Sequence, residues 1–121
     1  MTALATLIAQ ARLPYCVPTL DDGPPLRVEV GDGVVLVDGV RLAIRTATDL
    51  SRAIRCSLEG RVSRTVRPRE RTPLMVCRIS DDLVRVDGRR IARPHAVRLS
   101  VALDMAAAQA AGLLVVEAAP G

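Results

Sequence analysis

An internal repeat with a period of 49 residues limits the folds available to this chain more than any other feature. When the sequence is shifted by 49 positions, residues 24–54 align with residues 73–103 without a gap, and 12 of the 31 pairs are identical. Two copies are too few for a solenoid, whose core is built by stacking many repeats. We therefore predict a single domain, residues 1–121, that contains two related units at about residues 24–60 and 73–112.

Both units begin with alternating apolar and polar residues, which indicates a strand with one buried face. A second run of apolar residues follows in each unit and ends at an Asp-Gly pair, residues 38–39 and 87–88. Asp-Gly favours a two-residue type I′ hairpin, because both loop residues then adopt positive φ. The expected inward residues of the opening strands are Leu26, Val28 and Val30 in the first unit and Met75, Cys77 and Ile79 in the second.

Hairpins closed by a two-residue turn have fixed cross-strand partners. The first hairpin should place Val37 opposite Val40 and Leu36 opposite Arg41. The second should place Val86 opposite Arg89 and Arg85 opposite Arg90. Two arginines would therefore face each other at a position where the first unit has a leucine and an arginine.

A helix is expected after each hairpin. Residues 46–49 match a capping box, and the apolar stripe that follows them ends near Gly60. A second stripe ends near Gly112, and an additional helix is expected first, at residues 4–11. The predicted fold class is α+β, with internally duplicated β-meander-plus-helix units and one curved antiparallel sheet against which the helices pack.

This order of elements resembles, in architecture, two groups of proteins. One is the Whirly group of single-stranded-DNA-binding proteins, in which sheet-plus-helix units are duplicated. The other is the dimeric type III secretion chaperones. The chain carries no sequence motif of either group, and with Tyr15 as its only aromatic residue it lacks the side chains on which single-strand binders stack bases.

Composition excludes several classes of protein. No apolar run reaches the roughly 18 residues of a membrane span, and no basic stretch precedes the first apolar residues as in a secretory signal. The chain has three cysteines, Cys16, Cys56 and Cys77, an odd number, and no two of them form a C-x-x-C motif. We therefore expect reduced, mostly buried thiols in a cytoplasmic protein that holds no metal or cofactor. A core without Phe or Trp buries modest area, which favours a homo-oligomer.

Charge is distributed unevenly along the chain. All 17 basic residues are arginine, and residues 61–98 contain 11 of them with only four acids. The rest of the chain carries six arginines and nine acids. A segregated basic segment indicates an anionic partner, nucleic acid first, through salt-sensitive contacts to phosphates. For the connector, residues 61–72, three alternatives to nucleic-acid binding remain. It is a solvated loop, it binds an acidic protein, or it contacts an acidic patch on a second subunit.

Nothing in the sequence supports catalysis. His95 is the only histidine and lies between the second hairpin and its helix, where structural or solvated histidines are common. Gly31-Asp32-Gly33 and Asp81-Asp82 are expected to form turns.

We therefore expect a non-enzymatic binding protein that contacts nucleic-acid phosphates through its second half, with no small-molecule substrate. The alternative is a dimeric adaptor that binds another polypeptide, as secretion chaperones do. The candidate binding residues are Arg61, Arg64, Arg67, Arg69, Arg71, Arg85, Arg89, Arg90 and Arg93.

Overall fold

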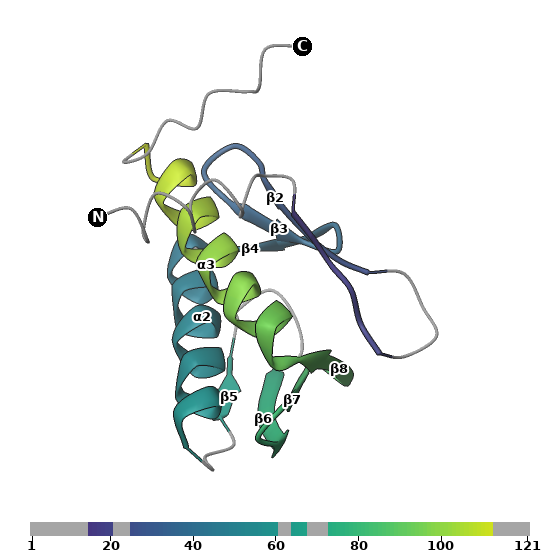
Figure 1. The fold of residues 1–121 in the computed structure, drawn as a ribbon. Coiled ribbons are helices and arrows are strands. Elements are labelled where there is room, and N and C mark those ends of the chain that lie inside the picture. Colours follow the sequence, from purple (N-terminus) through teal and green to yellow (C-terminus); the bar gives the residue numbers. More distant parts are fainter. Residues whose placement is uncertain (1–14, 21–24, 61–63, 68–72, 113–121) are drawn as a thin grey trace, which may run out of the picture.

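The computed structural model describes residues 15–20, 25–60, 64–67 and 73–112, and these residues form an α+β fold (Figure 1). Instead of one curved sheet there are two four-stranded antiparallel meanders, β1-β2-β3-β4 and β5-β6-β7-β8. We call them the first and second sheets. The helix expected at residues 4–11 lies outside the described residues, among which a strand comes first. The elements are β1 (Tyr15–Val17), β2 (Leu26–Val30), β3 (Val35–Val37), β4 (Val40–Leu42), α2 (Ile44–Glu59), β5 (Arg64–Val66), β6 (Leu74–Ser80), β7 (Leu83–Val86), β8 (Arg89–Ala92) and α3 (Arg93–Ala110).

Both Asp-Gly turns form as the sequence predicts. Asp38 and Asp87 have φ values of 52° and 51°, and the glycines that follow them have φ values of 77° and 82°. The predicted partners are also confirmed, including Arg85 opposite Arg90. Asp38 further secures its turn, because its Oδ1 accepts a 3.0 Å hydrogen bond from the backbone N–H of Arg27.

The opening strand of the second sheet differs from the sequence prediction by one residue. Leu74 and Val76 are its buried residues, whereas Met75 is 59 % exposed and Ile79 is 43 % exposed. Strand side chains alternate between faces, so a shift of one residue exchanges the two faces. A β-bulge between Arg78 and Ser80 absorbs the extra residue, and the later strands return to the 49-residue spacing.

Each helix covers the sheet that it does not directly follow. Helix α2 follows the first sheet but packs on β5, β6 and β7 of the second. Helix α3 follows the second sheet, and its main strand contacts are with β1, β2 and β3 of the first. Figure 1 shows α2 beside β5, and α3 running from the end of β8 up to the first sheet. Because of this exchange, the helix that covers each sheet comes mainly from the other unit.

The two helices pack on each other across small side chains. The Ser51 hydroxyl in α2 donates a 2.9 Å hydrogen bond to the backbone carbonyl oxygen of Ser100 in α3. Both serines are buried, and they are 49 residues apart. A second contact between the helices is the 3.0 Å ion pair of Arg55 with Asp104, which are also 49 residues apart.

The expected capping box does not form at α2. The helix begins at Ile44, with Ala43 at the N-cap and no side-chain cap, so Thr46 lies within its first turn. The Thr48 hydroxyl donates instead to the Arg45 carbonyl oxygen at 2.8 Å. The chain passes directly from the hairpin into the helix, so the N-cap, Ala43, lies three residues before Thr46, the N-cap that the polar signal predicts.

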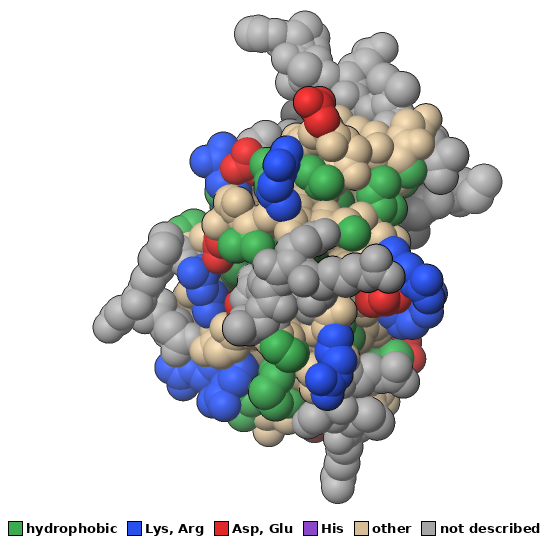
Figure 2. Space-filling model, turned by 180° about the vertical axis from the view of Figure 1, so that it is seen from behind, with side chains coloured by type: hydrophobic (Ala, Val, Ile, Leu, Met, Phe, Trp, Pro, Cys, Tyr) green, Lys and Arg blue, Asp and Glu red, His purple; other side chains and the backbone are tan. Residues whose placement is uncertain are grey.

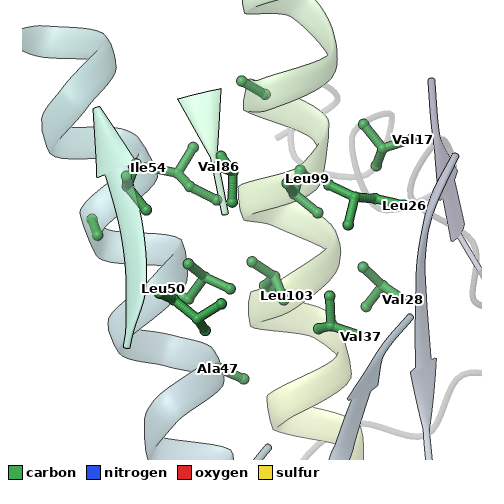
Figure 3. Packing of buried hydrophobic residues seen from close by; sticks show 14 of the residues in the cluster. Val17, Leu26, Val28, Val37, Ala47, Leu50, Ile54, Val86, Leu99 and Leu103 are labelled. Atoms are coloured by element: carbon green, nitrogen blue, oxygen red, sulfur yellow. The ribbon is translucent and has the colours of Figure 1, made fainter. Parts of the chain in front are cut away.

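One aliphatic cluster joins both sheets and both helices. Figure 3 shows Val28 and Val37 of the first sheet on one side of α3, with Leu50 and Ile54 of α2 on the other. Leu99 and Leu103 of α3 are almost completely buried. The core is therefore continuous across the helix crossing, and it is built from Val, Leu, Ile and Ala, as the composition requires.

Candidate functional site

The outer face of the second sheet, turned away from the helices, is the candidate binding surface. Val84 and Val86 of β7 are buried, so Arg85 between them points outward and is exposed. Arg90 lies directly opposite on β8 and is also exposed. On the other side of Arg85, its partner on β6 is Cys77. Two guanidinium groups therefore project from adjacent positions on one sheet face.

The strands of the second sheet carry only one sign of charge. They contain five arginines and no Asp or Glu. The first sheet offers an internal comparison, because its strands contain two arginines and one Glu. That residue, Glu29, forms an ion pair with Arg27 and lies in register with Leu36, which faces Arg41. Of the five arginines, Arg85 and Arg90 project from the outer face. The outer face of the first sheet combines Arg27 and Arg41 with Glu29, so the outer face of the second sheet is the more electropositive of the two.

Exposed apolar side chains lie on the same sheet. Met75 and Ile79 of β6 are two of the four large hydrophobic residues exposed among those the structure describes. In the lower part of Figure 2, where Figure 1 places the second sheet, hydrophobic and basic side chains adjoin. The face therefore combines positive charge with apolar surface.

The three arginines that replace apolar residues of the first unit do not form one surface. Arg85 is on the outer face, but Arg89 turns inward and pairs with Asp38 of the first sheet at 3.0 Å. Arg93, the first residue of α3, donates to the carbonyl oxygens of Leu58 and Asp81 at 3.0 and 3.2 Å. Strand alternation and the start of the helix separate these side chains, so Arg89 and Arg93 hold parts of the fold together.

The basic connector is described only in part. Arg61, Arg69 and Arg71 lie outside the described residues, and Arg64 belongs to β5. Arg67 is exposed and lines an open groove of about 360 Å³ between α2 and β5. Arg52 of α2 lines the same groove together with Asp49. No local sequence pattern connects Arg52 with β5, which begins 12 residues further along the chain.

Other candidate groups show no catalytic arrangement. His95 is half-buried in the first turn of α3, and its buried Nδ1 has no hydrogen-bond partner among the described atoms. The Asp81 carboxylate pairs with Arg78. Over residues 15–112, leaving out the undescribed gaps, no three His, Cys, Asp or Glu side chains come together as metal ligands. The cysteines are free thiols, and Cys16 is exposed while Cys56 and Cys77 are half-buried, so they are less buried than expected.

Tyr15 of β1 is the one described residue with a clearly shifted pKa. Burial raises the pKa of its hydroxyl above the ordinary value of 10.0. The positive charge of Arg98 and its hydrogen bond to the hydroxyl act in the opposite direction and lower the pKa. Burial has the larger effect, so the phenol stays protonated under ordinary conditions.

Comparisons with protein-family models, curated proteins and solved structures find no match to this chain. In the part of the chain that the structure describes, neither helix is long and apolar enough to cross a membrane. Function must therefore be argued from the chemistry of the surface, because a fold alone does not define an activity.

Proposed function

We propose that this protein is a non-enzymatic binding protein that contacts nucleic-acid phosphates on the outer face of its second sheet. The observation that carries the proposal is the pair Arg85 and Arg90, exposed and directly opposite each other on strands that contain no acid. Arg67 lies beside the groove between α2 and β5, so the proposed surface centres on Arg85 and Arg90.

Arginine suits this task because its planar guanidinium donates two parallel hydrogen bonds to phosphate. Side chains opposite each other on antiparallel strands have Cβ atoms about 5 Å apart, so one phosphate can lie between two guanidinium groups. Such contacts neutralise the backbone and do not read base edges, so they give affinity without sequence preference. Binding should weaken steeply with salt as counterions are released.

The test compares two single substitutions that remove the same charge from equivalent surfaces. Arg85→Leu installs the residue that the first unit has at this position, Leu36. Arg41→Leu removes an exposed arginine from the outer face of the first sheet. Binding of mixed-sequence single-stranded and double-stranded DNA and RNA is measured by fluorescence anisotropy at about 50 and about 200 mM salt, a range over which phosphate contacts lose much of their affinity.

Arg85→Leu should weaken binding and reduce the slope of log K against log salt by about 0.7 to 0.9, the value for one lost phosphate contact. Arg41→Leu should leave both quantities near those of the unmodified protein. Equal effects of the two substitutions would mean that only net charge matters. That result, or no binding to any of the nucleic acids, would refute the proposal.

A second candidate partner is an acidic polypeptide, and the exposure of Met75 and Ile79 favours it. Phosphate groups make no favourable contact with these apolar side chains, whereas a peptide with both acidic and apolar residues would bury them. Met75→Ser should then weaken binding of such a peptide while leaving any DNA or RNA binding unchanged. If Met75→Ser changes neither, the acidic-polypeptide candidate is eliminated.

We further propose that the two units derive from duplication of one β-meander-plus-helix unit. The support is the same element order in both, with Ser51 contacting Ser100 and Arg55 contacting Asp104, each pair 49 residues apart. Residues that meet their own equivalents are what a two-fold arrangement of two copies produces. Replacing residues 35–42 with residues 84–91 should therefore give a folded chain by circular dichroism, and failure to fold would count against equivalence.

A further inference from the structure

An apolar cavity of about 210 Å³ lies where the two sheets and both helices meet. Its walls come in pairs from the two units: Leu26 and Leu74 from the opening strands, Val37 and Val86 from the hairpins, and Leu50 and Leu99 from the helices. All six side chains are at least nine-tenths buried. Asp38 and Asp87, the first residues of the two hairpin turns, line the exposed end.

The composition explains why this space is not filled. The chain has no Phe or Trp, and the apolar side chains that line this region are all Leu or Val. Val40 lines the cavity from the first hairpin, and its counterpart in the second hairpin is Arg89. The guanidinium of Arg89 is 3.0 Å from the Asp38 carboxylate and bridges the two hairpins beside the mouth.

We propose that this cavity is a binding site for a small, uncharged, apolar molecule containing a single aromatic ring. An engineered cavity of about 150 Å³ lined by Leu, Ile and Phe stays dry and binds benzene, so the larger space here accepts a substituted ring. Drug-sized ligands need more room, since their pockets begin at about 300 Å³. The site is separate from the outer face of the second sheet and does not depend on the function proposed for that face.

The chemistry of the walls selects against charge. The six buried side chains are aliphatic and offer no partner to a carboxylate or an ammonium, so a charged group there would be desolvated without compensation. The Asp38 carboxylate at the mouth already accepts from Arg27 N–H and pairs with Arg89. An apolar ring, in contrast, replaces empty space with van der Waals contacts.

The test uses fluorobenzene as the probe, followed by ¹⁹F NMR on the full chain. Benzoate serves as a charged analogue of similar size. Val37→Ile/Val86→Ile adds one methyl group to each side of the cavity. Val35→Ile/Val84→Ile is the matched control, because these valines lie two residues earlier on the same strands, are also buried, and do not line the cavity.

Fluorobenzene should bind saturably and raise the melting temperature, since it binds only the folded state. Benzoate should bind at least about tenfold more weakly, because its carboxylate would be either buried without a partner or placed beside Asp38 and Asp87. The cavity-filling double substitution should weaken fluorobenzene binding severalfold at unchanged or higher melting temperature. The control should keep the affinity and lose stability, because each added methyl group overpacks a buried position outside the cavity.

Three outcomes would overturn the proposal. They are the absence of saturable binding up to the solubility of fluorobenzene, equal affinity for benzoate, and unchanged affinity for fluorobenzene after the cavity is filled. If Val35→Ile/Val84→Ile does not fold, Val84→Ile alone replaces it as the control. The comparison of fluorobenzene with benzoate needs no variant and tests the proposal independently.

Discussion

The Ser51 hydroxyl donates a 2.9 Å hydrogen bond to the carbonyl oxygen of Ser100, the residue 49 positions further along the chain. The Ser100 hydroxyl makes a different bond, donating to the Val97 carbonyl oxygen of its own helix at 2.7 Å. Two serines at equivalent sequence positions therefore make different hydrogen bonds. The Ser51 hydroxyl links α2 to α3, and the Ser100 hydroxyl donates within α3.

This difference predicts unequal effects of the same substitution. Ser51→Ala should lower the free energy of unfolding by about 1 kcal/mol, because it removes a buried hydrogen bond between helices. Ser100→Ala should cost less than about 0.5 kcal/mol, since its hydroxyl bonds only within its own helix and the carbonyl that Ser51 needs remains. Urea denaturation measures both, and a larger loss for Ser100→Ala would contradict this assignment.

The ion pair of Arg55 with Asp104 should contribute little to stability. The two side chains are 53 % and 38 % exposed, so water screens their attraction. A double-mutant cycle with Arg55→Ala and Asp104→Ala should give a coupling energy of about 0.5 kcal/mol, which molar salt removes. Reversing the pair with Arg55→Asp/Asp104→Arg should restore most of the stability that Asp104→Arg alone removes. If the reversed pair is no more stable than Asp104→Arg, the contact is not electrostatic.

The register of β6 can be checked with two neighbouring truncations. Val76→Ala should lower the free energy of unfolding by about 2 kcal/mol, because it removes buried methyl groups and leaves a cavity. Met75→Ala, on the exposed face, should change it by less than about 0.5 kcal/mol. The register expected from the repeat alone, with Met75 inward, would give the reverse order.

Stability should fall at high pH because of Tyr15. Its folded-state pKa is raised above 10.0, so the unfolded chain loses this proton first. The contribution of the protonated phenol is complete below pH 10.0 and is lost as the pH rises through the folded-state pKa. Tyr15→Phe should remove this part of the pH dependence, which urea denaturation from about pH 9 upward would measure.

The titration of Tyr15 can also be observed directly, because it is the only tyrosine of the chain. The ultraviolet absorbance of the phenolate should give a midpoint above 10.0. Arg98→Leu should raise this midpoint further, because it removes the positive charge and the hydrogen bond that favour the phenolate. A midpoint that falls in Arg98→Leu would show that the two side chains do not interact in this way.

Local chemistry was sufficient to predict the hairpins and the opposition of Arg85 and Arg90. An Asp-Gly turn needs two residues with positive φ, and a two-residue turn fixes every pair on the strands that it joins. The candidate site depends on this local relation, so its two central arginines were found from sequence alone. The α+β class followed in the same way from alternation and helical periodicity.

Features that depend on residues far apart in the chain needed the tertiary structure. The repeat placed Met75 inward, but pairing of β6 with β5 and β7 selected Leu74 and Val76, with a bulge absorbing the difference. Arg89 and Arg93 looked equivalent to Arg85, yet their partners are Asp38 and Leu58, which no local pattern identifies.

The sequence by itself determined the two hairpins and the helices that follow them, because turns, alternation and helical stripes depend on neighbours within a few residues. Strand β1 was not among the elements that it predicted. Only the tertiary structure decided that each helix covers the other sheet and that a cavity remains between them. The reason is that the apolar stripes of α2 and α3 carry no information about which sheet they bury against. That choice depends on the total packing of both units around the contact between Ser51 and Ser100.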